Sequence, residues 1–404
     1  MRSSSSKFID GRRERAIPDY MLSSLRLKER LNIRLDPGIE LLGVLDMLDA
    51  GRKPAFVLPG HPYGRAIAKA FSSFKAHPAV KLNAAIAESD LEGSRRKDAL
   101  MRRGAPPALV FDEALSANRG DDERSGALEP WLAALRDFAR DSKFLDGFAE
   151  RERLLEAELA ELRARVAKAD YIGALERYTG ETYEGRYTLI ASPLCQDGGV
   201  LNRVWTRDDG AGEIISLVKL EESRAGGMTF VDSDLDACVW HELAHGVLDL
   251  TANLYDHEQR DTPLDLGPKL SRNCRNWLHG LREHLVRAVM LRLIALDSGE
   301  KAAAKIYSEE GFSARPHLKA FIEHLKEYER SRKEYPSLSD FYPRLVAVFP
   351  KPASSPAVAP GAAPYTTAGQ RAAALRRLDR LLIRSKDARL IARRAALAKI
   401  KPAC

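Results

Sequence analysis

The stretch His241-Glu242-Leu243-Ala244-His245 decides both the fold and the chemistry expected of this 404-residue chain. Residues four apart lie one above the other on a helix, so the two imidazoles leave the same face and can share one metal ion. Glu242 is rotated about 100° from His241, so its carboxylate can approach a metal-bound water without being a ligand. Zinc lowers the pKa of such a water towards neutrality, and the carboxylate can take its proton. The motif therefore predicts a hydrolase that binds one Zn²⁺ per chain, with Glu242 as the base.

The residues around this motif predict a long, central helix from about Ser233 to Tyr255. Asp232 or Ser233 can cap its N-terminus. An apolar stripe then continues to its far end through Leu235, Val239, Leu243, Val247, Leu250 and Leu254. The alternative is that His241 and His245 are hydrogen-bonded core histidines and that Glu242 lies on a solvated edge.

A catalytic zinc site needs a third protein ligand and leaves the fourth position open. The extended metzincin pattern does not supply it, because Leu248 stands at its glycine position and Thr251 at its last histidine position. The candidates downstream are Asp256, His257, Glu258, His279, Glu283 and His284.

We choose Glu283 from this set because it shares a helical face with three apolar residues, Val286, Met290 and Ile294. A carboxylate on an apolar stripe is costly unless a charged group meets it, and a zinc ion is such a group. The alternative is a buried ion pair with Arg287, four residues later. His284 faces another side and is expected to pack or to be solvated.

The rest of the pattern indicates an α+β, mostly helical protein. Three β-rich runs separated by Gly/Asp turns predict a small antiparallel sheet directly before the HExxH helix: Tyr187–Ser192, Val200–Thr206 and Glu213–Leu220. A further strand is expected at Asn32–Leu35. Helices are expected at Ile39–Leu48, Tyr63–Ala76, Trp131–Thr179, Arg272–Ser298, Lys301–Ser308 and Arg315–Arg332.

Composition and spacing divide the chain into five parts. They are a flexible basic leader (1–31), a mainly helical N-terminal part (32–180), a catalytic part with the HExxH helix (181–348), a Pro/Ala-rich linker (349–366) and a basic amphipathic C-terminal helix (367–404). No apolar run follows the charges between Met1 and Tyr20, so the chain as written shows no signal peptide, and localisation stays open.

The net charge of +7 is concentrated in the tail. Residues 365–404 hold eleven Lys or Arg against two Asp, which is +9 and leaves −2 for the rest. A nucleic-acid partner is not expected, because such proteins carry their positive charge on the folded domain. The tail could instead bind an anionic surface, although a helix docked on the body is the preferred interpretation. Four cysteines without CxxC spacing argue against a disulfide framework or a thiolate zinc site.

The HExxH motif with a later glutamate resembles that of a known family. HELAH, followed 38 residues after His245 by Glu283, is similar to the gluzincin group of metallopeptidases. Within that group the chain resembles an uncharacterised bacterial family, domain of unknown function 4932. Further stretches carry the same resemblance, from about Asn32 to Val348: Asp36–Leu42, Phe71–Val80, Tyr187–Leu194 and Asp340–Pro343. Gly38 departs from the family pattern, where a larger residue is expected.

The resemblance implies a zincin-like peptidase domain, with metal ligands at His241, His245 and Glu283 and the base at Glu242. The partner is then a peptide or protein substrate, of a kind that the family does not specify. The alternative is a catalytically retired zincin-fold protein that binds or scaffolds and keeps a structural zinc. An intact Glu242 argues against this alternative, because a structural site needs no base.

Three residues outside the motif receive lesser roles. Tyr342 is a weak candidate for the donor that steadies the oxyanion in such enzymes. Glu40 is expected to cap the first turn of its own helix, and His77 precedes Pro78 at a helix end, so structural roles are expected for both.

Overall fold

The computed structural model describes residues 30–49, 60–89, 94–113, 126–182, 185–194, 203–206, 212–222, 227–231, 235–256, 276–309, 311–312, 315, 317–350, 372, 374–379, 382, 390–391, 394–395 and 398. Several predictions from the sequence lie outside these residues. They concern the leader before Arg30, the two Gly/Asp turns, the caps Asp232 and Ser233, the ligand candidates His257 and Glu258, and the linker after Pro350.

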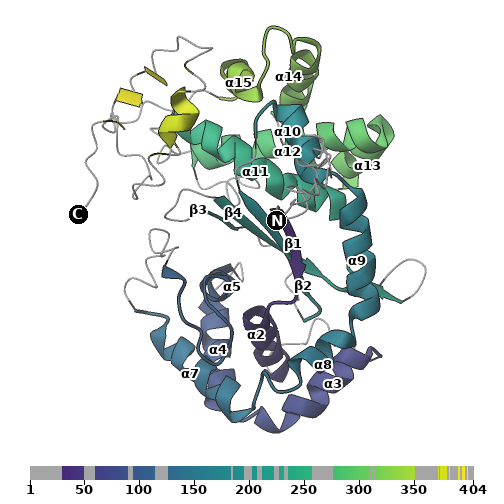
Figure 1. Cartoon of the computed structure of the whole chain (residues 1–404), viewed down its shortest axis with the longest axis vertical. Helices are drawn as coiled ribbons and strands as arrows, with labels where there is room; N and C mark the ends of the chain where they lie inside the picture. The colour runs from purple at the N-terminus through teal and green to yellow at the C-terminus, as the bar shows by residue number, and fades with distance from the viewer. Residues whose placement is uncertain are drawn as a thin grey trace, which may run out of the picture.

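A four-stranded mixed sheet lies at the centre of the described structure (Figure 1). Its strand order is β1-β2-β4-β3. β1 (Leu31–Arg34) and β4 (Gly212–Lys219) flank β2 (Arg186–Ser192), and both run parallel to it. β3 (Arg203–Thr206) pairs antiparallel with β4. β5 (Glu221–Glu222) and β6 (Met228–Thr229) form a separate antiparallel pair.

The predicted antiparallel sheet is therefore wrong in its topology, although the strands lie where they were expected. Three consecutive strands in a meander would place β3 between β2 and β4, whereas β3 lies outside β4. The physical reason is burial on both faces: six of the seven residues of β2 are buried, as in the interior of a parallel sheet. β1 supplies the second neighbour from far upstream, with Leu31 opposite Tyr187.

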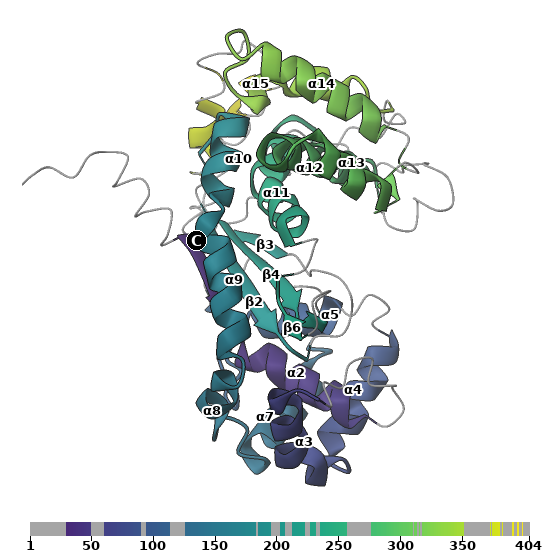
Figure 2. The ribbon, with the colours of Figure 1, turned by 90° about the vertical axis from the view of Figure 1, so that its right-hand side faces the viewer.

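Helices from the first part of the chain cover one end of the sheet (Figures 1 and 2). Asp36 begins the first of them, because its side chain accepts hydrogen bonds from the backbone N–H groups of Gly38 and Ile39. These elements are α2 (Pro37–Leu48), α3 (Pro62–Phe71), the 3₁₀ turn η1 (Ser72–Phe74), α4 (Pro78–Ser89), α5 (Ser94–Met101), α7 (Glu129–Asp141) and α8 (Phe148–Arg153).

The helical run expected from Trp131 to Thr179 is four helices, α7 and α8 followed by α9 (Glu156–Lys168) and α10 (Tyr171–Thr179). Lys143 and Gly147 interrupt it with φ of 49° and 73°, in the left-handed region that a helix cannot continue through. Asp170 then starts α10 by accepting from the backbone N–H of Gly173. α9 runs alongside the sheet and joins the two groups of helices (Figure 2).

The second group of helices lies on the other side of the sheet and carries the HExxH motif (Figure 1). Its members are α11 (Leu235–Asp256), α12 (Trp277–Ser298), α13 (Glu300–Glu309), α14 (Leu318–Arg330) and α15 (Leu338–Val346). The expected mostly helical α+β class is confirmed. Within the described ranges, no helix has the length and apolar character that crossing a membrane requires.

Candidate metal centre

The apolar stripe of the HExxH helix is buried as the sequence predicts. Leu235, Val239, Leu243, Val247 and Leu254 are each at most 3% exposed, and Leu250 is half-buried. α11 packs against α12, β4 and α10. Because the helix is held on several sides, its motif residues have fixed positions relative to α12.

The second helix of the site, α12, begins at Trp277, where Asn276 caps it by accepting from the backbone N–H of His279. Val286, Met290 and Ile294 are buried, which confirms the apolar face that the sequence assigned to this helix. Glu283 lies on the same helix, and its side chain is 16% exposed.

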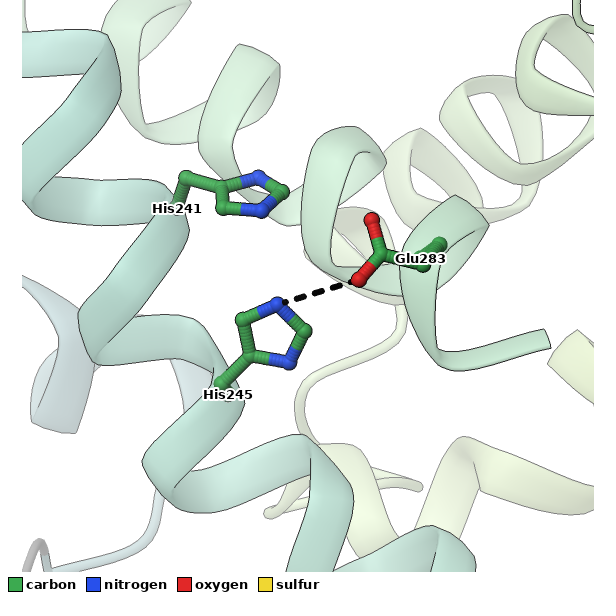
Figure 3. A group of neighbouring side chains, drawn as sticks. All are labelled: His241, His245 and Glu283. Atoms are coloured by element: carbon green, nitrogen blue, oxygen red, sulfur yellow. Dashed lines mark ion pairs between the residues drawn. The ribbon is translucent and has the colours of Figure 1, made fainter. Parts of the chain in front are cut away.

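The three expected ligands come together between α11 and α12 (Figure 3). His241, His245 and Glu283 each offer one donor atom, and these atoms lie within 4.8 Å of one another. Nε2 of His245 is 3.5 Å from Oε1 of Glu283. Among the residues that the structure describes, this is the one cluster of three or more His, Cys, Asp or Glu side chains arranged in this way.

Glu283 can be both a ligand candidate and the ion-pair partner of Arg287, because its two oxygens have different partners. Oε2 is paired with Nη1 of Arg287, the ion pair expected as the alternative. Oε1 faces Nε2 of His245 and lies 3.6 Å from Nε2 of His279. Arg287 also donates to the backbone carbonyl of Glu283 at 2.9 Å. The arginine therefore holds one oxygen and leaves the other directed at the histidines.

The donor set fits a zinc ion. Two imidazole nitrogens and one carboxylate oxygen make up a common catalytic zinc site with an open fourth position. With bonds of 2.0–2.2 Å, neighbouring ligand atoms of a tetrahedral site lie roughly 3.4 Å apart. The 3.5 Å between His245 and Glu283 is close to this spacing.

Glu242 is buried beside the cluster, at 5% exposure. Its Oε2 is buried and has no hydrogen-bond partner among the described residues. Burial raises the pKa of Glu242 to about 8, a change that the charge of His245 opposes and that of Glu283 reinforces. A buried carboxyl oxygen without a partner is costly, so its presence next to three metal-ligand side chains points to a chemical role.

Asp249 is a further residue of the site that was not predicted from the sequence. Its Oδ1 lies 3.0 Å from Nδ1 of His245, one turn along α11. Burial alone would raise the pKa of Asp249, but His245 and Arg282 lower it. The ionised carboxylate therefore accepts the hydrogen bond that Nδ1 of His245 donates. That hydrogen bond leaves Nε2 of His245 directed at Glu283, as metal-binding histidines require. The spacing could have indicated this contact, because Asp249 is four residues after His245 and therefore lies on the same face of the helix.

Burial and neighbouring charges shift the pKa values of the three side chains in different directions. Burial lowers the pKa of His241 well below its ordinary value, with His245 and Arg287 adding to the effect. Burial also opposes the charged form of His245, but the neighbouring carboxylates, Asp249 foremost, raise its pKa to about 9. The pKa of Glu283 lies well below its usual range, because His279 and Arg287 outweigh its burial.

His284, Asp256 and Tyr342 make contacts outside the cluster. His284 is fully buried, its Nδ1 bonds to the carbonyl of Gly280 at 2.7 Å, and its ring packs against Phe349, which confirms the expected packing role. Tyr342 donates to Oδ2 of Asp256 at 2.8 Å, at the end of α11. That contact leaves the suggested oxyanion role of Tyr342 without support.

Comparison with known proteins identifies a family. The model of the family described as "Domain of unknown function (DUF4932)" matches residues 49–348, more than half of the chain. The match ends where the resemblance was expected to end, but it begins after the segment Asp36–Leu42. No curated protein and no solved structure matches the chain.

Proposed function

We propose that this chain, which belongs to the family of the domain of unknown function DUF4932, is a zinc-dependent hydrolase. More specifically, we propose that it is a peptidase with a zincin-like catalytic part. The observation that carries the proposal is the meeting of the His241, His245 and Glu283 donor atoms within 4.8 Å. Glu242 lies beside them, and its buried Oε2 has no hydrogen-bond partner in the part of the chain that the structure describes.

Each residue has a distinct task. His241, His245 and Glu283 would hold one Zn²⁺, which when bound acidifies a water in its open position and polarises a carbonyl. Glu242 would serve as the base for such a water and as the acid towards the leaving amine. Burial keeps the pKa of Glu242 close to neutrality, where a group can both take up and release a proton. Asp249 and Arg287 hold the ligands His245 and Glu283 in place.

The competing function is a binding or scaffold protein in which zinc is purely structural. Glu242 favours the hydrolase, because a closed structural site has no use for a buried carboxyl oxygen that has no hydrogen-bond partner among the described residues. The substrate is expected to be a peptide or protein.

Metal analysis combined with cleavage-site profiling tests the proposal. The purified wild type should contain about one zinc per chain and cut members of a peptide library. Glu242→Gln should keep the zinc and lose the cleavage, by at least a factor of about 100. Equal cleavage by both proteins, or a wild type that binds zinc and cuts no peptide, would refute the peptidase assignment.

A further inference from the structure

Part of the C-terminal segment lies against the helix that carries the motif. Residues 374–379 are helical, and Leu378 is fully buried while Ala374 is 6% exposed. These residues follow the family match, which ends at residue 348. Residues 374–379 of the basic tail are therefore docked on the body.

Arg377 makes polar contacts between this docked part and the body. Its Nη2 lies 2.7 Å from Oγ1 of Thr251 and 3.4 Å from the backbone carbonyl of Val247, both on α11. The same nitrogen pairs with Oε2 of Glu181. The side chains of Arg377 and Glu181 are 11% and 12% exposed. This arginine is thus withdrawn from solvent and is not available to an anionic surface.

The contacts continue into a buried network that ties three elements together. Oγ1 of Thr251 lies 2.9 Å from Oγ of Ser339, on α15. Ser339 donates its backbone N–H to Oε1 of Glu181 at 3.1 Å. Glu181 follows α10 by two residues. Thr251 and Ser339 are 2% and 1% exposed, so Arg377 completes a hydrogen-bonded network that water does not replace.

The position of these contacts on α11 connects them to the metal centre. Val247 follows His245 by two residues, and Thr251 also donates its hydroxyl to the Val247 carbonyl at 3.2 Å. A threonine that bonds back to its own helix in this way tends to bend it. Any change of direction at this turn would move His245 relative to Glu283 on α12. Metal affinity depends on ligand distances within about 0.2 Å.

We propose that Arg377 is a positioning residue for the metal centre: by bridging Glu181, Thr251 and the Val247 carbonyl, it holds α11 in the orientation in which His245 faces Glu283. The C-terminal segment beyond the family domain thereby regulates the metal affinity of the site. This inference rests on the proposed zinc site. Its consequence is that whatever displaces the tail also weakens the hold on the metal.

The test compares Arg377→Ala with Arg376→Ala in the full chain. Arg376 is the preceding residue and is exposed, so its variant removes the same charge from the same helical segment without touching the network. Zinc affinity is measured by competition with a chromophoric chelator, under conditions where urea titration shows each protein to be folded. A merely structural role for Arg377 would leave the affinity of the folded protein unchanged. We expect about a tenfold weaker affinity for Arg377→Ala, and a change below about twofold for Arg376→Ala. Equal affinities would overturn the proposal.

Hydrogen exchange separates this inference from the zinc assignment. In the metal-free protein, the amides of residues 245–256 should exchange faster in Arg377→Ala than in Arg376→Ala. If the wild type binds no zinc, the proposed function fails, and the exchange alone decides whether Arg377 holds α11. Unchanged exchange would refute that role.

If Arg377→Ala does not fold, the pair Arg377→Lys and Arg376→Lys serves the same measurements, because one ammonium group cannot reproduce the guanidinium bridge. Indistinguishable lysine variants would likewise refute the proposal.

Discussion

His245 and Asp249 are joined by a contact of 3.0 Å between Nδ1 and Oδ1, one turn apart on α11. The carboxylate fixes the tautomer of the imidazole and makes Nε2 a better metal ligand. Arg282 lies 3.9 Å from the same oxygen, so the aspartate is supported from α12 as well. The candidate site therefore has supporting contacts beyond His241, His245 and Glu283.

Replacing this supporting carboxylate should weaken the metal site without removing it. Asp249→Ala is expected to lower zinc affinity by a factor of about 10 to 100, because His245 loses the acceptor that orients it. Chelator competition measures the change. Asp297→Ala, at an exposed position near the end of α12, serves as the control and should bind zinc as the wild type does. Matching affinities for the two variants would remove Asp249 from the site.

Loss of the third ligand should abolish stabilisation by zinc. A ligand that binds only the folded state stabilises it by about 4 kcal/mol at a thousandfold excess over its dissociation constant. Thermal unfolding with and without zinc should show this shift for the wild type. It should be absent for Glu283→Gln. Glu323→Gln, which removes a 58% exposed carboxylate paired with Lys326, should keep it. A full zinc shift in Glu283→Gln would show that the third ligand lies elsewhere.

Glu40 should make the stability of the fold depend on pH. Burial raises its pKa from 4.5 to about 7, against the opposing effect of hydrogen bonds from Tyr63 and Ser192. The folded state therefore holds this proton more tightly than the unfolded state. The contribution of Glu40 to the free energy of unfolding is complete below about pH 4.5. It is lost as pH rises through about 7, a change of about 3 kcal/mol.

Urea unfolding at pH 5 and pH 8 measures this contribution. The wild type should lose more stability between the two values than Glu40→Gln, whose amide does not titrate. Glu150→Gln, at a side chain that is 68% exposed, should behave as the wild type. The same pH dependence in all three proteins would show that Glu40 does not titrate in this range.

The candidate metal cluster could be predicted closely from the sequence because its parts are local or periodic. Two histidines and a base within one helical segment fix their own relative positions. The apolar face of α12 singled out Glu283 among six candidates. The ion pair with Arg287, treated as the alternative, coexists with the proposed ligand role because a carboxylate has two oxygens.

The sheet and Glu40 were predicted less well because their partners are distant in sequence. β1 pairs with β2 across about 150 residues, and no turn signal marks such a parallel pairing. Glu40 was expected to cap its own helix, which Asp36 does instead. Its partners are Tyr63 and Ser192, 23 and 152 residues away, and no local pattern could indicate them.

An anomalous difference map, recorded at the zinc absorption edge from crystals of the zinc-loaded protein, would locate the metal itself. We predict one peak per chain, about 2.0–2.2 Å from a nitrogen of His241, a nitrogen of His245 and a carboxylate oxygen of Glu283. No peak between α11 and α12, or a peak bound by other residues, would contradict the account.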